Sequence, residues 1–262
     1  MSATTALDME AGDKLRTTVT TDRPSKLRWV GQPLVCLIAV VGSLTYVRLA
    51  NVSESERRSL GTSTLLTLLR QHLTISLIAT VLVSAIAIPL GILLTRGSMR
   101  RLSKPIITIA GFGQAAPAIG LIALGAAIVG IGTTGAVIAL TVYGILPIVA
   151  NTVAGLDGVD PRLVEAARGM GMSATSTLLR VELPLALAVI VAGVRTALVL
   201  IVGTAALATF IGAGGLGSLI TTGITLQQNV TLIVGAILVG ALALFIDWLA
   251  RLMELVAAPK GI

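Results

Sequence analysis

Charged residues are scarce in this sequence, and that scarcity excludes a water-soluble globular domain. Only 12% of the 262 residues are charged, while 55% are hydrophobic. Soluble domains carry about 25% charged residues. The mean hydropathy is +0.98, so the apolar side chains must face lipid or other buried helices. We therefore predict a membrane protein.

Cysteine and histidine each occur once, as Cys36 and His72. One cysteine excludes an internal disulfide, and together they are too few for a His/Cys metal cluster. We interpret Cys36 as a small buried hydrophobic residue and His72 as a polar residue at a helix end. We expect no metal site. The pattern G-x-x-x-x-G-K-[ST] is also missing, so ATP hydrolysis would require a partner chain.

The net charge of +7 raises the alternative of nucleic-acid binding. The basic residues, however, lie in short clusters between apolar runs rather than along one surface. That distribution is typical of membrane orientation and not of a surface that follows phosphates. We expect contact with a lipid bilayer and none with nucleic acid.

Six apolar stretches are long enough to cross a bilayer, whose hydrocarbon core needs roughly 20 residues per helix. None shows the strict alternation of a strand. The predicted fold is all-α, a polytopic membrane protein with about six transmembrane helices. The spans are residues 33–49, 73–94, 106–129, 134–153, 185–210 and 230–249.

Basic residues concentrate before the first span, between spans two and three, between spans four and five, and after the sixth. Six spans place these segments on one side, which the positive-inside rule makes cytoplasmic. Arg57, Arg58 and Arg70 after span one weaken the bias without reversing it. We expect both termini in the cytoplasm, with a disordered tail over residues 1–28. The first helix and an external segment follow over 29–64, a core over 65–255 and a short end over 256–262.

The link between spans four and five, residues 155–184, is polar. Asp160 and Pro161 predict a helix start, and a short helix should run to about residue 168. Gly169 and Gly171 should end it, and Ser173 should cap a second short helix over 174–182. Pattern alone leaves two interpretations open, a surface loop and a docking element.

The same link matches the pattern EAA-x3-G-x9-I-x-L-P of ABC importer permeases, with Val181 replacing the isoleucine. The matching residues are Glu165, Ala166, Ala167, Gly171, Val181, Leu183 and Pro184. In that family the loop is a coupling helix that docks on a separate ATPase. The resemblance implies polar contacts from Glu165, close packing at the alanines and a sharp turn at Gly171. It also implies ABC ATPase partners that hold ATP and Mg, a second identical or paralogous permease subunit, and an extracytoplasmic substrate-binding protein.

Residues 67–96, 158–187 and 193–220 further resemble permeases for osmoprotectants, namely glycine betaine, carnitine, choline and proline betaine. The chain departs from that family at 111–121, which matches only loosely, and at Ser218, where aspartate is common. Methionine-importer permeases share the type I ABC importer architecture, so a methionine or other amino-acid importer is the alternative. An ATP-independent channel or secondary carrier is the alternative from another class.

Five residues form the predicted substrate pathway: Arg195, Gln114, Pro117, Tyr143 and Thr204. An intramembrane arginine is costly unless it is paired or hydrated. Arg195 is therefore either a pathway or gate residue, or a structural arginine bonded to carbonyls or a neighbouring subunit. Gln114 and Pro117 interrupt span three and mark a bent segment, although local packing explains them nearly as well. Asp247 and Arg251 should form an ion pair at a helix end.

Gly212, Gly214, Gly215 and Gly217 satisfy G-x-G-x-x-G. They follow a membrane helix and not a strand, which argues against a dinucleotide site. We expect an outer loop that packs tightly at the external mouth. Aromatic residues make up only 3% of the chain, too few for a cage around a quaternary ammonium group. Selectivity is therefore expected to reside mainly in the binding protein.

Overall fold

The protein is described here by a computed structural model covering residues 26–50 and 52–257, in which every regular element is helical. The predicted tail over 1–28 and the predicted end over 256–262 lie outside these residues, apart from their junctions with the first and last helices. The predicted all-α class is therefore observed throughout the described ranges.

Five helices are long and apolar enough to cross a membrane, and they match five of the six predicted spans. Each contains an apolar stretch with few charged residues, as roughly 20 residues of helix in lipid require. The span that we predicted to begin at residue 73 begins at Thr62 instead. The helices are α2 (Lys26–Leu49), α4 (Thr62–Leu94), α7 (Thr133–Asp157), α10 (Leu183–Thr204) and α12 (Asn229–Ala257).

The remaining span, the third predicted one over residues 106–129, is broken. After the 3-10 helix η1 (Gly97–Leu102), helices α5 (Ser103–Ala115) and α6 (Ala118–Val129) meet at 98°. Ala116 adopts an extended conformation, with φ −64° and ψ 143°, because the ring of Pro117 disfavours helical backbone in the residue before it. The single span over 106–129 was thus wrong in shape, while the interruption expected at Pro117 is present.

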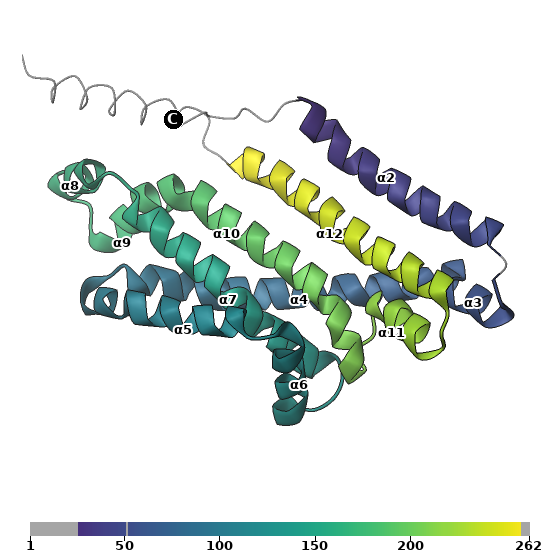
Figure 1. Cartoon of the computed structure of the whole chain (residues 1–262). Coiled ribbons are helices and arrows are strands. Elements are labelled where there is room, and N and C mark those ends of the chain that lie inside the picture. The colour runs from purple at the N-terminus through teal and green to yellow at the C-terminus, as the bar shows by residue number, and fades with distance from the viewer. Residues whose placement is uncertain (1–25, 51, 258–262) are drawn as a thin grey trace, which may run out of the picture.

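The core lies between α4, α7 and α10 (Figure 1). Ala79, Leu140 and Ile201 are fully buried there, one from each helix. Glycines allow the helices to approach closely, since a Cβ at Gly91 would lie 2.6 Å from Cβ of Thr152 and one at Gly193 would lie 2.6 Å from Cβ of Asn151. Small residues at contacts are how helices pack where lipid supplies no hydrophobic driving force.

Helix α2 lies at the edge of the bundle against α12 (Figure 1). Leu37 and Ile38 are exposed, whereas Cys36 is buried as predicted. The bundle has two distinct ends. One carries α8 (Pro161–Gly169) and α9 (Ala174–Thr177), and we call it the α8 end. The other, the α11 end, carries α3 (Glu54–Ser59) and α11 (Gly217–Thr225).

Candidate coupling and translocation sites

Helix α8 begins where the sequence predicts. The Asp160 carboxylate accepts a hydrogen bond from the Arg162 backbone N–H at 2.9 Å, and Pro161 occupies the first turn. Within the motif, Glu165 and Ala166 are exposed while Ala167 is buried. Met170 is 78% exposed. The helix therefore packs through Ala167 and the half-buried Val164 and presents a carboxylate and the Met170 side chain outward.

Gly171 ends α8 in a left-handed turn. Its φ is +87°, its N–H donates to the Arg168 carbonyl, and the Met172 N–H donates to the Ala167 carbonyl. This pair of hydrogen bonds is the Schellman arrangement, whose left-handed position favours glycine. Gly169, expected to help break the helix, is its last residue instead. The sharp turn expected at Gly171 is observed.

The second predicted short helix is not separate from span five. Ser173 caps α9 as expected, accepting from the Ser176 N–H at 3.2 Å. A π turn, η2 (Leu178–Glu182), then leads directly into α10, and residues Ala174–Ile211 form one run of 38 residues. Pro184 would clash with the carbonyl four residues earlier in a regular helix, and the wider turn lies directly before it. This correction makes α9 the beginning of a long membrane helix.

A buried carboxylate anchors that turn. Glu182 is 6% exposed, and its two oxygens accept hydrogen bonds from Nη1 and Nη2 of Arg96 at the end of α4. The neighbouring motif residues Val181 and Leu183 are half-buried, and Pro184 is exposed. We had not identified Arg96 or Glu182 from the sequence, because a pairing across 86 residues leaves no local signal.

Arg195 belongs to an ion-pair network between α10 and α12. Its Nε donates to Asp247 Oδ1 at 2.9 Å and its Nη1 donates to Glu254 Oε2 at 2.9 Å. Arg251 Nη2 reaches Asp247 Oδ2 at 3.2 Å, as predicted, and Gln32 Nε2 donates to the same oxygen at 3.0 Å. The charges of Arg195 and Arg251 are thus balanced by those of Asp247 and Glu254. Carboxylates, and not carbonyls, satisfy Arg195, and its pathway role stays a prediction.

The other predicted pathway residues do not gather around Arg195. Gln114 lies in the last turn of α5 and Pro117 in the α5–α6 bend. Tyr143 is half-buried on α7, and Thr204 is the last residue of α10. His72 also differs from its prediction. It is buried inside α4, with Nε2 2.9 Å from the Val202 carbonyl, because that helix starts at residue 62.

Residues 212–217, which we call the glycine loop, pack closely on α4 and on the 3-10 helix η3 (Ala205–Ile211). Gly212, Gly214 and Gly215 have φ of +73°, +79° and +90°. The Gly215 N–H donates to Gln71 Oε1 at 3.1 Å. A Cβ at Gly217 would lie 1.9 Å from the Ala206 carbonyl oxygen. The tight packing expected of this loop is observed.

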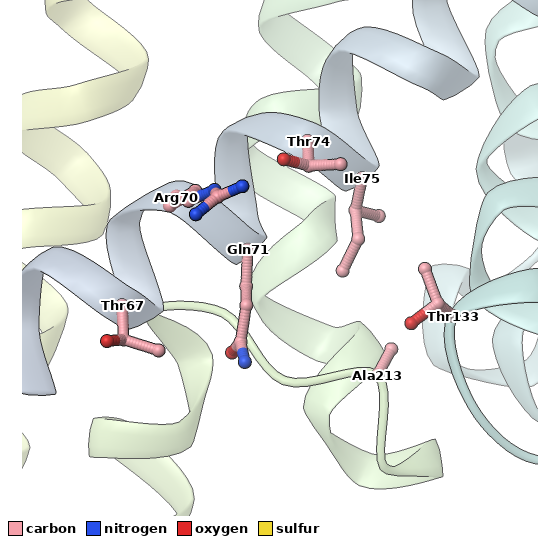
Figure 2. Close-up of a pocket in the computed structure, with 7 residues that line it drawn as sticks. All are labelled: Thr67, Arg70, Gln71, Thr74, Ile75, Thr133 and Ala213. Carbon is pink, nitrogen blue, oxygen red and sulfur yellow. The ribbon is translucent and has the colours of Figure 1, made fainter.

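A pocket of about 400 Å³ lies beside the glycine loop at the α11 end (Figure 2). It is formed by the first third of α4, the start of α7 and the loop itself. Our sequence analysis missed it, because its lining residues are spread over three segments. Its polar side chains and the loop residue are Thr67, Arg70, Gln71, Thr74, Thr133 and Ala213.

Long apolar helices, a broken span and an exposed EAA helix that leads through the turn at Gly171 into a membrane helix define a multi-pass transport subunit of the type I ABC importer class. The chain belongs to the family described as "Binding-protein-dependent transport system inner membrane component", which matches residues 87–255. That match includes the whole of residues 155–184, the predicted coupling loop. The protein is thus a membrane permease subunit.

Relatives and solved structures agree with this assignment. The chain is 40% identical over 192 residues to the glycine betaine/carnitine/choline transport system permease protein OpuCB of Bacillus subtilis (strain 168), covering 73% of this chain and 88% of that one. It is 41% identical over 202 residues to the osmoprotectant import permease protein OsmW of Salmonella typhimurium, covering 73% and 91%. The inward-facing MetNI methionine ABC transporter has a similar fold, with TM-score 0.66 and 23% identity over 79% of this chain and 100% of that one.

Proposed function

We propose that the protein is the permease of an ATP-driven importer for quaternary ammonium osmoprotectants, the class that includes glycine betaine, carnitine, choline and proline betaine. The observation that carries this proposal is the 40% identity, across 73% of the chain, to a permease named for three of these solutes. The fold alone does not favour these solutes over methionine, because MetNI shares it at 23% identity.

The α8 end supports a coupling role. Glu165, Ala166 and Met170 are exposed there and form a ready contact surface for an ATPase subunit. Helix α8 joins α9 through the hydrogen-bonded turn at Gly171, and α9 continues through the π turn into α10. A displacement of α8 would therefore pass through this short turn to the membrane span. ATP binding on the partner would draw two such surfaces together and reopen the spans toward the binding protein. Hydrolysis would then restore the inward-facing state.

The orientation follows from charge. Arg96, Arg100, Arg101 and Lys104 lie at the α8 end with the coupling loop, so this end faces the cytoplasm. The α11 end then faces outward, where the binding protein delivers solute. ATP and Mg are bound by the ATPase partner, since this chain has no P-loop pattern. Both termini are cytoplasmic in this arrangement.

A second permease subunit is part of the proposal. Helices α5 and α6 expose Ile109, Phe112 and Ile128 at 68%, 73% and 74%. One chain supplies one wall of a pathway between two subunits, and these exposed apolar faces suit either the partner or lipid. The number of permease chains in the purified complex can be measured directly, and we expect two.

The test is solute uptake into proteoliposomes that hold this chain with its co-purified partners and binding protein. Labelled glycine betaine, choline and methionine are compared with and without internal ATP. ATP-dependent uptake of the quaternary amines is the expected result. Methionine uptake would instead assign the protein to amino-acid import, and flux without ATP would indicate a channel or secondary carrier.

A further inference from the structure

Arg70 is one of several exposed arginines, Arg57 among them, that have no carboxylate partner in the described residues, and it is the arginine that lines the pocket. Arg58, Arg96, Arg100, Arg195 and Arg251 all form ion pairs with carboxylates. Arg70 pairs with no carboxylate in the described part of the chain, and it lines the pocket at the α11 end (Figure 2). An unpaired guanidinium at a pocket wall is a ready site for an anion.

The remaining lining favours a small polar anion. Thr74 and Thr133 supply hydroxyl groups, whereas the Thr67 hydroxyl donates to the Ser63 carbonyl at 2.8 Å. No carboxylate or aromatic ring lines the pocket. Gln71 is held by the Gly215 N–H at its Oε1, so its Nε2 remains available to donate. The volume of about 400 Å³ falls within the range of roughly 300–1,000 Å³ typical of small-molecule sites.

The glycine loop gives this pocket a defined wall. Any Cβ at Gly214 would lie 2.5 Å from Gln71 Oε1, and one at Gly215 would lie 3.2 Å from Nδ1 of His72. Side chains at these positions would therefore displace the loop from α4. The loop backbone approaches Gln71, the neighbour of Arg70, because glycines occupy both positions.

We propose that the pocket at Arg70 receives the carboxylate of a zwitterionic solute as the solute leaves the binding protein. This inference rests on the proposed function. A guanidinium fork can hold both oxygens of a carboxylate, while the hydroxyls of Thr74 and Thr133 can donate to the same group. Without aromatic rings the pocket cannot cage the ammonium end. The site therefore recognises one end of the solute and holds it weakly enough to pass it on.

The proposal separates two solutes of the proposed class. Glycine betaine carries a carboxylate, whereas choline carries an alcohol. Arg70→Gln should therefore lower the maximal ATP-dependent uptake rate of glycine betaine about tenfold, since hydrogen bonds to charged groups contribute that much or more. Choline uptake should be unchanged or faster, because a cation near its ammonium group is removed. Arg70→Lys, which keeps the charge and loses the fork, should be intermediate.

The experiment uses the complete complex with saturating loaded binding protein, so that affinity of the binding protein does not set the rate. Arg57→Gln is the matched control, because Arg57 is also exposed at the α11 end but does not line the pocket. The measured quantity is the ratio of glycine betaine to choline uptake. A fall in that ratio in Arg70→Gln alone supports the proposal.

Three results would overturn it. Equal losses for both solutes, with more binding protein needed for half-maximal uptake, would make Arg70 a contact for the binding protein. Unchanged uptake of both would remove any role for Arg70. A wild-type complex that imports choline but no betaine or carnitine would contradict the carboxylate site while leaving the proposed function intact. Failure of the wild type to import any quaternary amine would instead refute the proposed function itself.

Discussion

Arg195 on α10 and Asp247 on α12 are joined by two nitrogen–oxygen contacts, 2.9 Å from Nε and 2.8 Å from Nη2, although 52 residues separate them in sequence. Side chains of both are largely buried, at 23% and 16% exposure. Ionised groups within apolar spans are costly unless they pair. This contact therefore joins the outer helix α12 to the core and allows Arg195 to remain charged there.

Removing either Arg195 or Asp247 should deprive the other charge of a partner and lower the stability of the protein. We expect Arg195→Gln to lower stability by about 3 kcal/mol, because Asp247 and Glu254 would lose their shared cation. Arg58→Gln is the control, since its pair with Glu54 is exposed at 78% and 79% and should contribute at most about 1 kcal/mol. Thermal unfolding in detergent measures both. Addition of Asp247→Asn to the Arg195→Gln variant should cost less than Asp247→Asn alone. Additive effects would show that the two side chains are not coupled.

The turn at Gly171 provides a comparison between two glycines of one loop. A Cβ at either Gly169 or Gly171 would meet no atom within 4 Å, but only Gly171 has a positive φ, +87°. We expect Gly171→Val to strain the turn by at least about 1–2 kcal/mol and to abolish ATP-dependent uptake, with membrane insertion retained. Gly169→Ala should transport normally. Equal activity in the two variants would contradict the left-handed turn as the requirement.

The exposed carboxylate of Glu165 should be sensitive to charge reversal. If α8 docks on an ATPase subunit, Glu165→Arg places a wrong charge in that contact, which costs several kcal/mol when like charges meet. We expect at least tenfold weaker co-purification of the ATPase subunit and loss of uptake. Lys104→Glu, also exposed at the α8 end, is the control. Normal co-purification of Glu165→Arg would argue against the assigned docking surface.

Close packing of the glycine loop leads to a stability prediction. At Gly217 an added Cβ meets the Ala206 carbonyl at 1.9 Å, whereas at Gly203 it meets nothing within 4 Å. Gly217→Ala should therefore destabilise the protein by about 1–3 kcal/mol or more, and Gly203→Ala should be neutral or stabilise α10 by up to about 1 kcal/mol. Unfolding midpoints in detergent distinguish them. A neutral Gly217→Ala would show that the loop can move away from η3 at little cost.

Several features could be predicted because their causes are local. An apolar run of membrane length predicts a helix wherever it lies, and the caps at Asp160 and Ser173 use hydrogen bonds to N–H groups two or three residues away. The turn at Gly171 could likewise be predicted, because glycine adopts the left-handed backbone conformation of a sharp turn at little cost.

Other features depend on contacts between distant segments. The Arg96–Glu182 pair spans 86 residues and the Gln71–Gly215 hydrogen bond spans 144. The pocket at Arg70 requires α4, α7 and the glycine loop to meet, which no spacing reveals. The continuity of α9 with α10 was missed for another reason. Pro184 usually marks a helix start, but here a π turn precedes it and the helix continues.

The π turn at Leu178–Glu182 also limits how the length of this segment can vary. The Leu183 N–H bonds to the Leu178 carbonyl, so the turn holds one residue more than an α-helical turn. Deleting the exposed Leu179 would restore a regular helix. Each residue rotates a helix by about 100° and advances it by about 1.5 Å, so α8 and Glu165 would then point in another direction. The nine-residue spacing between Gly171 and Val181 thus sets the direction in which α8 presents Glu165. If α8 docks on an ATPase subunit as proposed, a permease with another residue count here would present that surface at another angle.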